Sequence, residues 1–217
     1  MDFEAARKHM VDSQVRTNDV TDPRIQRAFE AVPRERFLPA ELRAQAYIDR
    51  EVVYAPGRSM ATARDLAKLL DALDIGSSDL VLDIACGSGY SAAILAMLGE
   101  MVVAVEPDDA LAGVAQDNWA AIGAVNAAVV AADPTAGVPK QGPFDVILIG
   151  QAIETEPSAL LAQLKDGGRL GAFVLERGVS RGCLWLRSGA AAGMTELFDA
   201  SMRTVLGGFT RPKTFVF

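Results

Sequence analysis

The chain has 217 residues, of which 50% are hydrophobic and 23% charged, and its formal net charge is −7. This length and composition fit one globular domain and exclude disordered, collagen-like and coiled-coil proteins. The negative charge argues against nucleic acid as the main partner, and the apolar runs are far shorter than the roughly 20 residues of a membrane helix.

The N-terminus carries no apolar signal segment, so we expect a cytoplasmic protein in which Cys86 and Cys183 are reduced. The single histidine, His9, lies among charged residues and is expected on a solvated helix surface. One histidine and two cysteines cannot form a multi-histidine metal centre or a four-cysteine zinc site. We therefore expect no metal.

The first 75 residues are predicted to be mainly helical. Helices are expected at 3–15, 24–32 and 62–73, and a loop rich in Arg and Pro at 33–56. Thr62 and Asp65 have the spacing of a capping box, which places the start of the third helix.

From residue 79 onward, strand-sized apolar runs alternate with helical stretches. The expected strands are 79–84, 101–106, 126–131, 144–149 and 169–175, and the expected helices are 90–98, 108–122 and 157–164. Continuous apolar character is typical of parallel strands buried on both faces, and the alternation predicts a doubly wound, Rossmann-like α/β domain.

The end of the chain differs, because short apolar runs are separated there by glycine-rich breaks. These runs lie at 183–186, 194–198 and 214–217. They predict an antiparallel hairpin at the edge of a mostly parallel seven-stranded sheet.

The strongest local signal is a glycine loop between the first strand and the next helix, with the sequence Asp83-Ile84-Ala85-Cys86-Gly87-Ser88-Gly89. Glycines allow the backbone to approach a ligand closely, beside the amides of a helix N-terminus. The pattern matches the loop that holds the amino-acid end of S-adenosylmethionine, whose ammonium group suits the Asp83 carboxylate. The nicotinamide fingerprint fits poorly because Ala92 stands at its third glycine position.

Polar residues also stand where the next three strands are expected to end. Glu106-Pro107 follows the second strand, where a carboxylate can accept from two ribose hydroxyls. Asp133 ends the third strand and either binds an adenine amino group or forms a turn with Pro134. Gln151 follows the fourth strand. We therefore predict a cofactor site formed by Asp83, Ala85, Gly87, Ser88, Gly89, Glu106, Pro107, Asp133 and Gln151.

The N-terminal part resembles that of the protein-L-isoaspartate O-methyltransferase family. The motifs that carry the resemblance are Met10-Val11-Asp12-Ser13-Gln14-Val15-Arg16, Asp22-Pro23-Arg24, Val32-Pro33-Arg34-Glu35-Arg36-Phe37-Leu38-Pro39 and Ala46-Tyr47. With the glycine loop and Pro143-Phe144-Asp145-Val146-Ile147, the likeness covers residues 10 to about 175.

The resemblance implies an S-adenosylmethionine-dependent methyltransferase fold with an N-terminal helical extension. It also implies methylation of the α-carboxylate of L-isoaspartyl residues in proteins or peptides, which starts protein repair. Residues 1–217 would form a single domain, with residues 1–75 on the substrate side and residues 76–217 as the cofactor-binding core.

The chain departs from the family at the loop that reads Gly-x-Thr-Ile-Ser-x-Pro. The matching residues here are Gly57-Arg58-Ser59-Met60-Ala61-Thr62-Ala63, so Ala61 stands where the reacting-centre Ser is expected. Ser59 is the candidate catalytic hydroxyl, displaced by two positions. Ala85 likewise replaces the first glycine of the cofactor loop, and we expect an adjusted turn there.

Two alternatives to isoaspartyl methylation stay open. One is a protein that binds S-adenosylmethionine without catalysis, and the other is a methyltransferase with a different substrate. A nicotinamide oxidoreductase is disfavoured by the glycine spacing.

Overall fold

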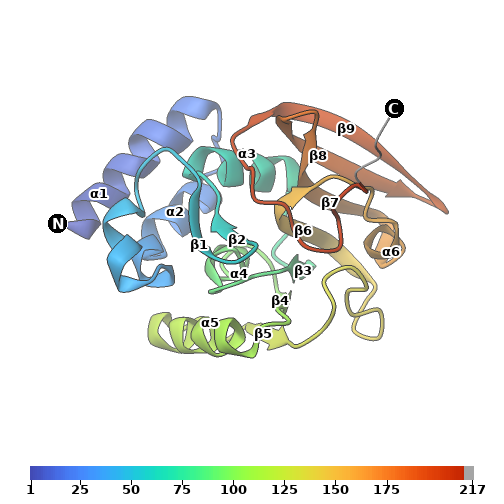
Figure 1. Cartoon of the computed structure of the whole chain (residues 1–217), viewed down its shortest axis with the longest axis horizontal. Coiled ribbons are helices and arrows are strands. Elements are labelled where there is room, and N and C mark those ends of the chain that lie inside the picture. The colour runs from blue at the N-terminus through green and yellow to red at the C-terminus, as the bar shows by residue number, and fades with distance from the viewer. Residues whose placement is uncertain (213–217) are drawn as a thin grey trace.

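A computed structural model describes residues 1–212 and places a seven-stranded sheet at the centre of the protein (Figure 1). The strand order is β5-β4-β3-β6-β7-β8-β9. The strands are β3 (Leu80–Ile84), β4 (Met101–Val105), β5 (Ala127–Val130), β6 (Phe144–Ile153), β7 (Leu164–Glu176), β8 (Val179–Ser188) and β9 (Ala191–Ala200).

The sheet is parallel from β5 to β7, and β8 and β9 extend it as antiparallel strands. This confirms the predicted mostly parallel seven-stranded fold with an antiparallel edge. The predicted strand at 214–217 lies outside the described residues.

Alternate residues of the parallel strands enter two different cores. Val81 packs on one face of the sheet, whereas Leu82 and Ile84 pack on the other. Burial on both faces explains why these strands read as continuous apolar runs.

The two faces of the sheet are covered unequally. The helices α3 (Ala63–Leu73), α4 (Tyr90–Leu95) and α5 (Asp109–Ile122) pack with the N-terminal helices against one face. Among the described residues, the other face is covered by α6 (Ser158–Leu161) and by loop residues such as Val138 and Phe209.

Two predicted core helices are shorter than expected. The helix predicted at 90–98 ends at Leu95, and turns with hydrogen bonds from Met97 and Leu98 follow it. The helix predicted at 157–164 is a single turn, because Leu164 already pairs with Phe144 in the sheet.

The N-terminal helices agree with the sequence in position but differ in detail. The predicted helix 3–15 consists of α1 (Phe3–Met10) and a π-helical turn (Val11–Val15), and a 3₁₀ turn (Arg16–Asn18) follows. The next helix is α2 (Pro23–Ala31). Thr62 caps α3, because its hydroxyl accepts from the Asp65 amide at 3.0 Å.

The region predicted as a loop at 33–56 contains regular structure. It holds 3₁₀ turns at Arg34–Phe37 and Ala40–Gln45 and the strand β1 (Val52–Ala55). β1 pairs with β2 (Arg58–Met60) in a separate antiparallel hairpin. Pro56 and Gly57 form its tip, where Gly57 has a φ of +66° that suits glycine.

Three further expectations can be compared directly. His9 is exposed on α1, and Cys86 and Cys183 are buried free thiols, as predicted. Within residues 1–212, no helix has the length and apolar character needed to cross a membrane.

Candidate cofactor site

The glycine loop lies between β3 and α4, where three residues adopt left-handed backbone conformations. Their φ values are +57° at Ala85, +56° at Gly87 and +92° at Gly89. The prediction of an adjusted turn at Ala85 is therefore wrong. Ala85 takes the left-handed conformation itself, at a cost of about 1 kcal/mol, so the loss of the glycine leaves the loop compact.

Asp83 provides a buried carboxylate with an unpaired oxygen. The side chain is fully buried, and its Oδ2 accepts from the Ser91 hydroxyl at 2.6 Å. Its Oδ1 has no hydrogen-bond partner among the described residues. Burial raises the pKa of this carboxyl from 3.8 to about 7, against the Ser91 hydrogen bond, which lowers it. A ligand ammonium group would satisfy this oxygen.

Glu106 lies directly after β4 and is 0% exposed. Its Oε2 accepts from the Gly87 amide at 2.9 Å, and its Oε1 accepts from the Asp108 amide at 3.2 Å. The structure thus brings Asp83, Glu106 and the glycine loop together at the carboxyl ends of β3 and β4, where parallel sheets bind ligands.

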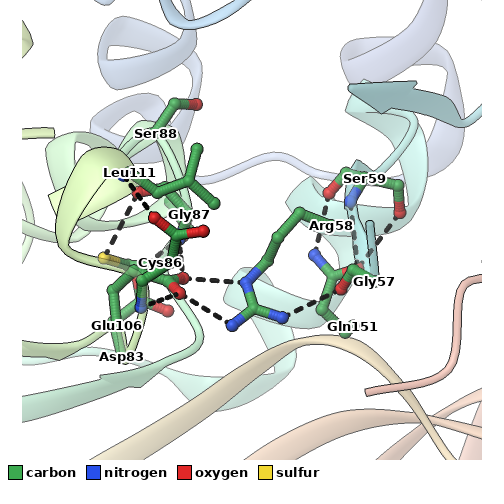
Figure 2. Close-up of polar contacts among 12 residues, drawn as sticks. Gly57, Arg58, Ser59, Asp83, Cys86, Gly87, Ser88, Glu106, Leu111 and Gln151 are labelled. Carbon is green, nitrogen blue, oxygen red and sulfur yellow. Dashed lines mark hydrogen bonds and ion pairs between the residues drawn. The ribbon is translucent and has the colours of Figure 1, made fainter. Parts of the chain in front are cut away.

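Arg58 of β2 reaches into this site and pairs with Glu106 (Figure 2). Its Nε donates to Oε2 and its Nη2 donates to Oε1, both at 2.8 Å. This two-point geometry is the strong form of an Arg–carboxylate pair. Arg58 is not among the site residues predicted from the sequence. The available signal was a single charged residue within the otherwise uncharged loop 57–63.

Tyr54 of β1 covers the glycine loop beside Arg58. Its hydroxyl accepts from the Ser88 amide at 3.3 Å, and a Cβ built on Gly87 would lie 1.9 Å from that hydroxyl oxygen. Only a glycine therefore leaves room for the hairpin at this position. Tyr54 was also missed, because the hairpin itself was not predicted.

Ser59, the candidate catalytic residue, and Gln151, a predicted cofactor residue, contact each other. The Gln151 amide donates to the Ser59 carbonyl at 2.8 Å and accepts from the Ser59 amide at 3.2 Å (Figure 2). Gln151 lies within β6 and does not follow it, which corrects the predicted strand end. The Ser59 hydroxyl is within donating distance of Glu51 at 2.6 Å and of the Gln151 side-chain oxygen at 3.1 Å.

The other predicted residues occupy more peripheral roles. The Ser88 hydroxyl donates to the Phe37 carbonyl at 2.6 Å, and Pro107 is exposed. Asp133 accepts from the amide and hydroxyl of Thr135 at 2.8 and 2.9 Å, which is the geometry of a turn. Of its two predicted roles, the structure displays the turn.

The space between the hairpin and the glycine loop is small. A cavity of about 30 Å³ remains there, lined among others by Tyr54, Ala61, Ser91 and Gln151. Ligand pockets for molecules of cofactor size hold roughly 300 Å³ or more. A hollow of about 310 Å³ lies between α6 and β9, but it contains none of the predicted site residues. The acceptor groups therefore suit S-adenosylmethionine in chemistry, and Tyr54 and Arg58 of the hairpin contact the residues that would hold it.

Comparisons with known proteins identify the family of this chain. The sequence profile of the family described as protein-L-isoaspartate(D-aspartate) O-methyltransferase matches residues 5–180. The chain belongs to this family. Its members are S-adenosylmethionine-dependent methyltransferases, as the sequence resemblance implies.

Named relatives cover most of the chain. A protein-L-isoaspartate O-methyltransferase from Koribacter versatilis is 34% identical over 77% of this chain and 76% of its own length. A relative of the same name from Methanoculleus marisnigri is 38% identical over 76% of this chain and 74% of its own.

Two solved structures share the fold. One protein-L-isoaspartate O-methyltransferase has a TM-score of 0.81 at 24% identity, over 93% of this chain and 66% of that one. A Plasmodium falciparum protein described as belonging to the same family, in complex with S-adenosyl-L-homocysteine, has a TM-score of 0.76 at 18% identity, over 92% and 97%. At these identities the comparison shows the fold.

Proposed function

We propose that the protein is an S-adenosylmethionine-dependent carboxyl O-methyltransferase whose acceptor is an isoaspartyl residue of a protein or peptide. The observation that carries the proposal is the buried Asp83 with one unpaired oxygen, placed beside Glu106 at the glycine loop of a chain of this family. The Plasmodium protein of the same fold binds S-adenosyl-L-homocysteine, the product form of the same cofactor.

The cofactor residues divide by chemistry. Asp83 would accept from the ammonium group, Glu106 from the ribose hydroxyls, and Gly87 and Gly89 let the backbone approach the ligand. When bound, S-adenosylmethionine supplies an electrophilic methyl group. Roles for Ala85, Ser88, Pro107, Asp133 and Gln151 at the cofactor stay predictions.

The acceptor side is formed by the loop that carries Ala61, which lines the small cavity. Buried Arg34 donates from Nη2 to the Ala61 carbonyl and from Nε to the Ala46 carbonyl at 2.6 Å, so it fixes the backbone of this loop. A carboxylate acceptor is already ionised near neutral pH and needs no base. Catalysis then depends on orientation, which the missing hydroxyl at Ala61 weakens.

The packing of the N-terminal helices on the sheet bears on how many domains the chain forms. We propose a single domain over residues 1–217, because the helices of residues 1–75 share a core with the sheet. The free thiols Cys86 and Cys183 support a reducing compartment, the cytoplasm.

Methyl transfer to an isoaspartyl peptide tests the proposed function. We expect slow turnover by the wild type and a rise of about 10-fold or more in Ala61→Ser, because a positioned hydroxyl is restored on an anchored backbone. Turnover should fall in Ser59→Ala if Ser59 substitutes for that hydroxyl. Binding of S-adenosyl-L-homocysteine is measured in parallel by calorimetry.

The outcomes of this assay separate the alternatives. Rapid turnover by the wild type that survives Ser59→Ala would show that neither hydroxyl is needed. Cofactor binding without turnover in any variant would favour the non-catalytic alternative, and turnover confined to other carboxylates would identify a different substrate.

A further inference from the structure

The Arg58–Glu106 pair uses the carboxylate that the cofactor ribose needs. A carboxylate offers about four acceptor positions on its two oxygens. In Glu106 two are used by the Gly87 and Asp108 amides and two by the Arg58 guanidinium (Figure 2). Ribose hydroxyls can therefore donate to Glu106 only after Arg58 has left.

Tyr54 blocks the same site by its volume. The Tyr54 hydroxyl oxygen would lie 1.9 Å from a Cβ built on Gly87. No ligand atom therefore fits between Tyr54 and the backbone of Gly87. The cavity of about 30 Å³ that Tyr54 also lines does not extend to Glu106. Charge pairing and steric contact thus close the site from the same hairpin.

The hairpin is not part of the central sheet. β1 and β2 form a two-stranded sheet of their own, outside the seven-stranded sheet. The tip residues Pro56 and Gly57 are exposed, whereas Ser59 forms hydrogen bonds with Gln151 and Glu51. Arg58 and Tyr54 therefore anchor the tip to the glycine loop.

We propose that Arg58 is an internal competitor for the ribose position, and that S-adenosylmethionine binds by displacing Arg58 from Glu106 and lifting the β1–β2 tip off the glycine loop. This inference rests on the proposed function for the identity of the cofactor. It makes Arg58 a residue that sets cofactor affinity, because the apparent dissociation constant rises as the open fraction falls.

Calorimetry with S-adenosyl-L-homocysteine tests the competition directly. Arg58→Met should bind the ligand about tenfold more tightly than the wild type. This is the gain expected if the closed state of the wild type is populated about ten times more than the open state. Arg58→Lys, which keeps the charge but cannot form the two-point pair, should lie between them. Arg36→Met removes an exposed arginine and should leave the affinity unchanged.

Alkylation of Cys86 reports the opening without the cofactor. This thiol is buried in the glycine loop, so it should react several-fold faster in Arg58→Met, and added S-adenosyl-L-homocysteine should protect it. Cys183, a buried residue of β8, is the internal control for global unfolding, and mass spectrometry resolves the two sites.

Equal or weaker ligand binding by folded Arg58→Met and Arg58→Lys would overturn the proposal, and so would an unchanged rate at Cys86. Failure of the isoaspartyl acceptor has a different signature, because it leaves these binding and alkylation results intact and removes only methyl transfer to the isoaspartyl peptide. Absence of ligand binding by the wild type and by every variant would instead reject the cofactor, and the inference with it.

Discussion

The Asp83 carboxyl is placed where its protonation state controls what it can bind. Burial raises its pKa to about 7, and nearby Glu106 raises it further, while the Ser91 hydroxyl partly stabilises the anion. Because the folded-state pKa lies above the ordinary 3.8, the folded protein holds one more proton than the unfolded chain between about pH 4 and 7. Stability contributed by this residue is therefore present at low pH and falls as the pH rises through that range.

Cofactor affinity should follow the opposite course. We predict that S-adenosyl-L-homocysteine binds more tightly as the pH rises through about 7, because only ionised Asp83 can pair with the ligand ammonium. Calorimetry between about pH 5.5 and 8 measures this, and Asp83→Asn serves as the reference for titration of the ligand itself. The same pH profile in both proteins would exclude Asp83 as the ammonium partner.

The β1–β2 hairpin is the element that the sequence conveyed least. Strands β3, β4 and β6 can be predicted because burial on both faces leaves a continuous apolar run in each. β1 and β2 are four and three residues long and leave no comparable pattern. The pair between Arg58 and Glu106 joins residues 48 positions apart, and local sequence carries no signal for such a contact. Glu106 could be placed at its strand end, but its partner could not.

Packing of the hairpin on the glycine loop can be measured through Gly87. Gly87→Ala should lower the free energy of unfolding by about 2–4 kcal/mol. The alanine would be strained in the left-handed backbone conformation, and its methyl group would overpack against Tyr54. Tyr54→Phe removes the hydroxyl that the new methyl group would meet, so the double variant should lose less than the sum of the single losses. Urea denaturation of all four proteins supplies the cycle. Strict additivity would mean that the hairpin does not rest on the loop in solution.

At the scale of the whole molecule, residues 201–206, which follow β9, contact the elements that hold the candidate site. Residues 201–206 lie beyond the part matched by the family profile, which ends at residue 180. Asp65 accepts from the Ser201 amide at 2.7 Å, and Ala152 of β6 donates to the Thr204 carbonyl at 3.0 Å. The sequence analysis assigned no functional residue to this region, and its contacts are structural, since they join the end of the chain to the elements that hold Ser59.

Glu51 is the residue through which this support reaches the loop that carries Ser59. Its carboxylate accepts from the Arg203 amide at 2.8 Å, from the Thr204 amide at 3.0 Å and from the Ser59 hydroxyl at 2.6 Å. We predict that Glu51→Ala lowers the free energy of unfolding by about 2–3 kcal/mol, because these donors lose a charged acceptor together. Glu41→Ala, at an exposed glutamate, should change it by less than about 0.5 kcal/mol. Urea denaturation followed by tryptophan fluorescence measures both variants. A loss in Glu51→Ala no larger than in Glu41→Ala would show that Glu51 does not transmit support from residues 201–206 to this loop, and the segment would then be attached through its other contacts, such as those with Asp65 and Ala152.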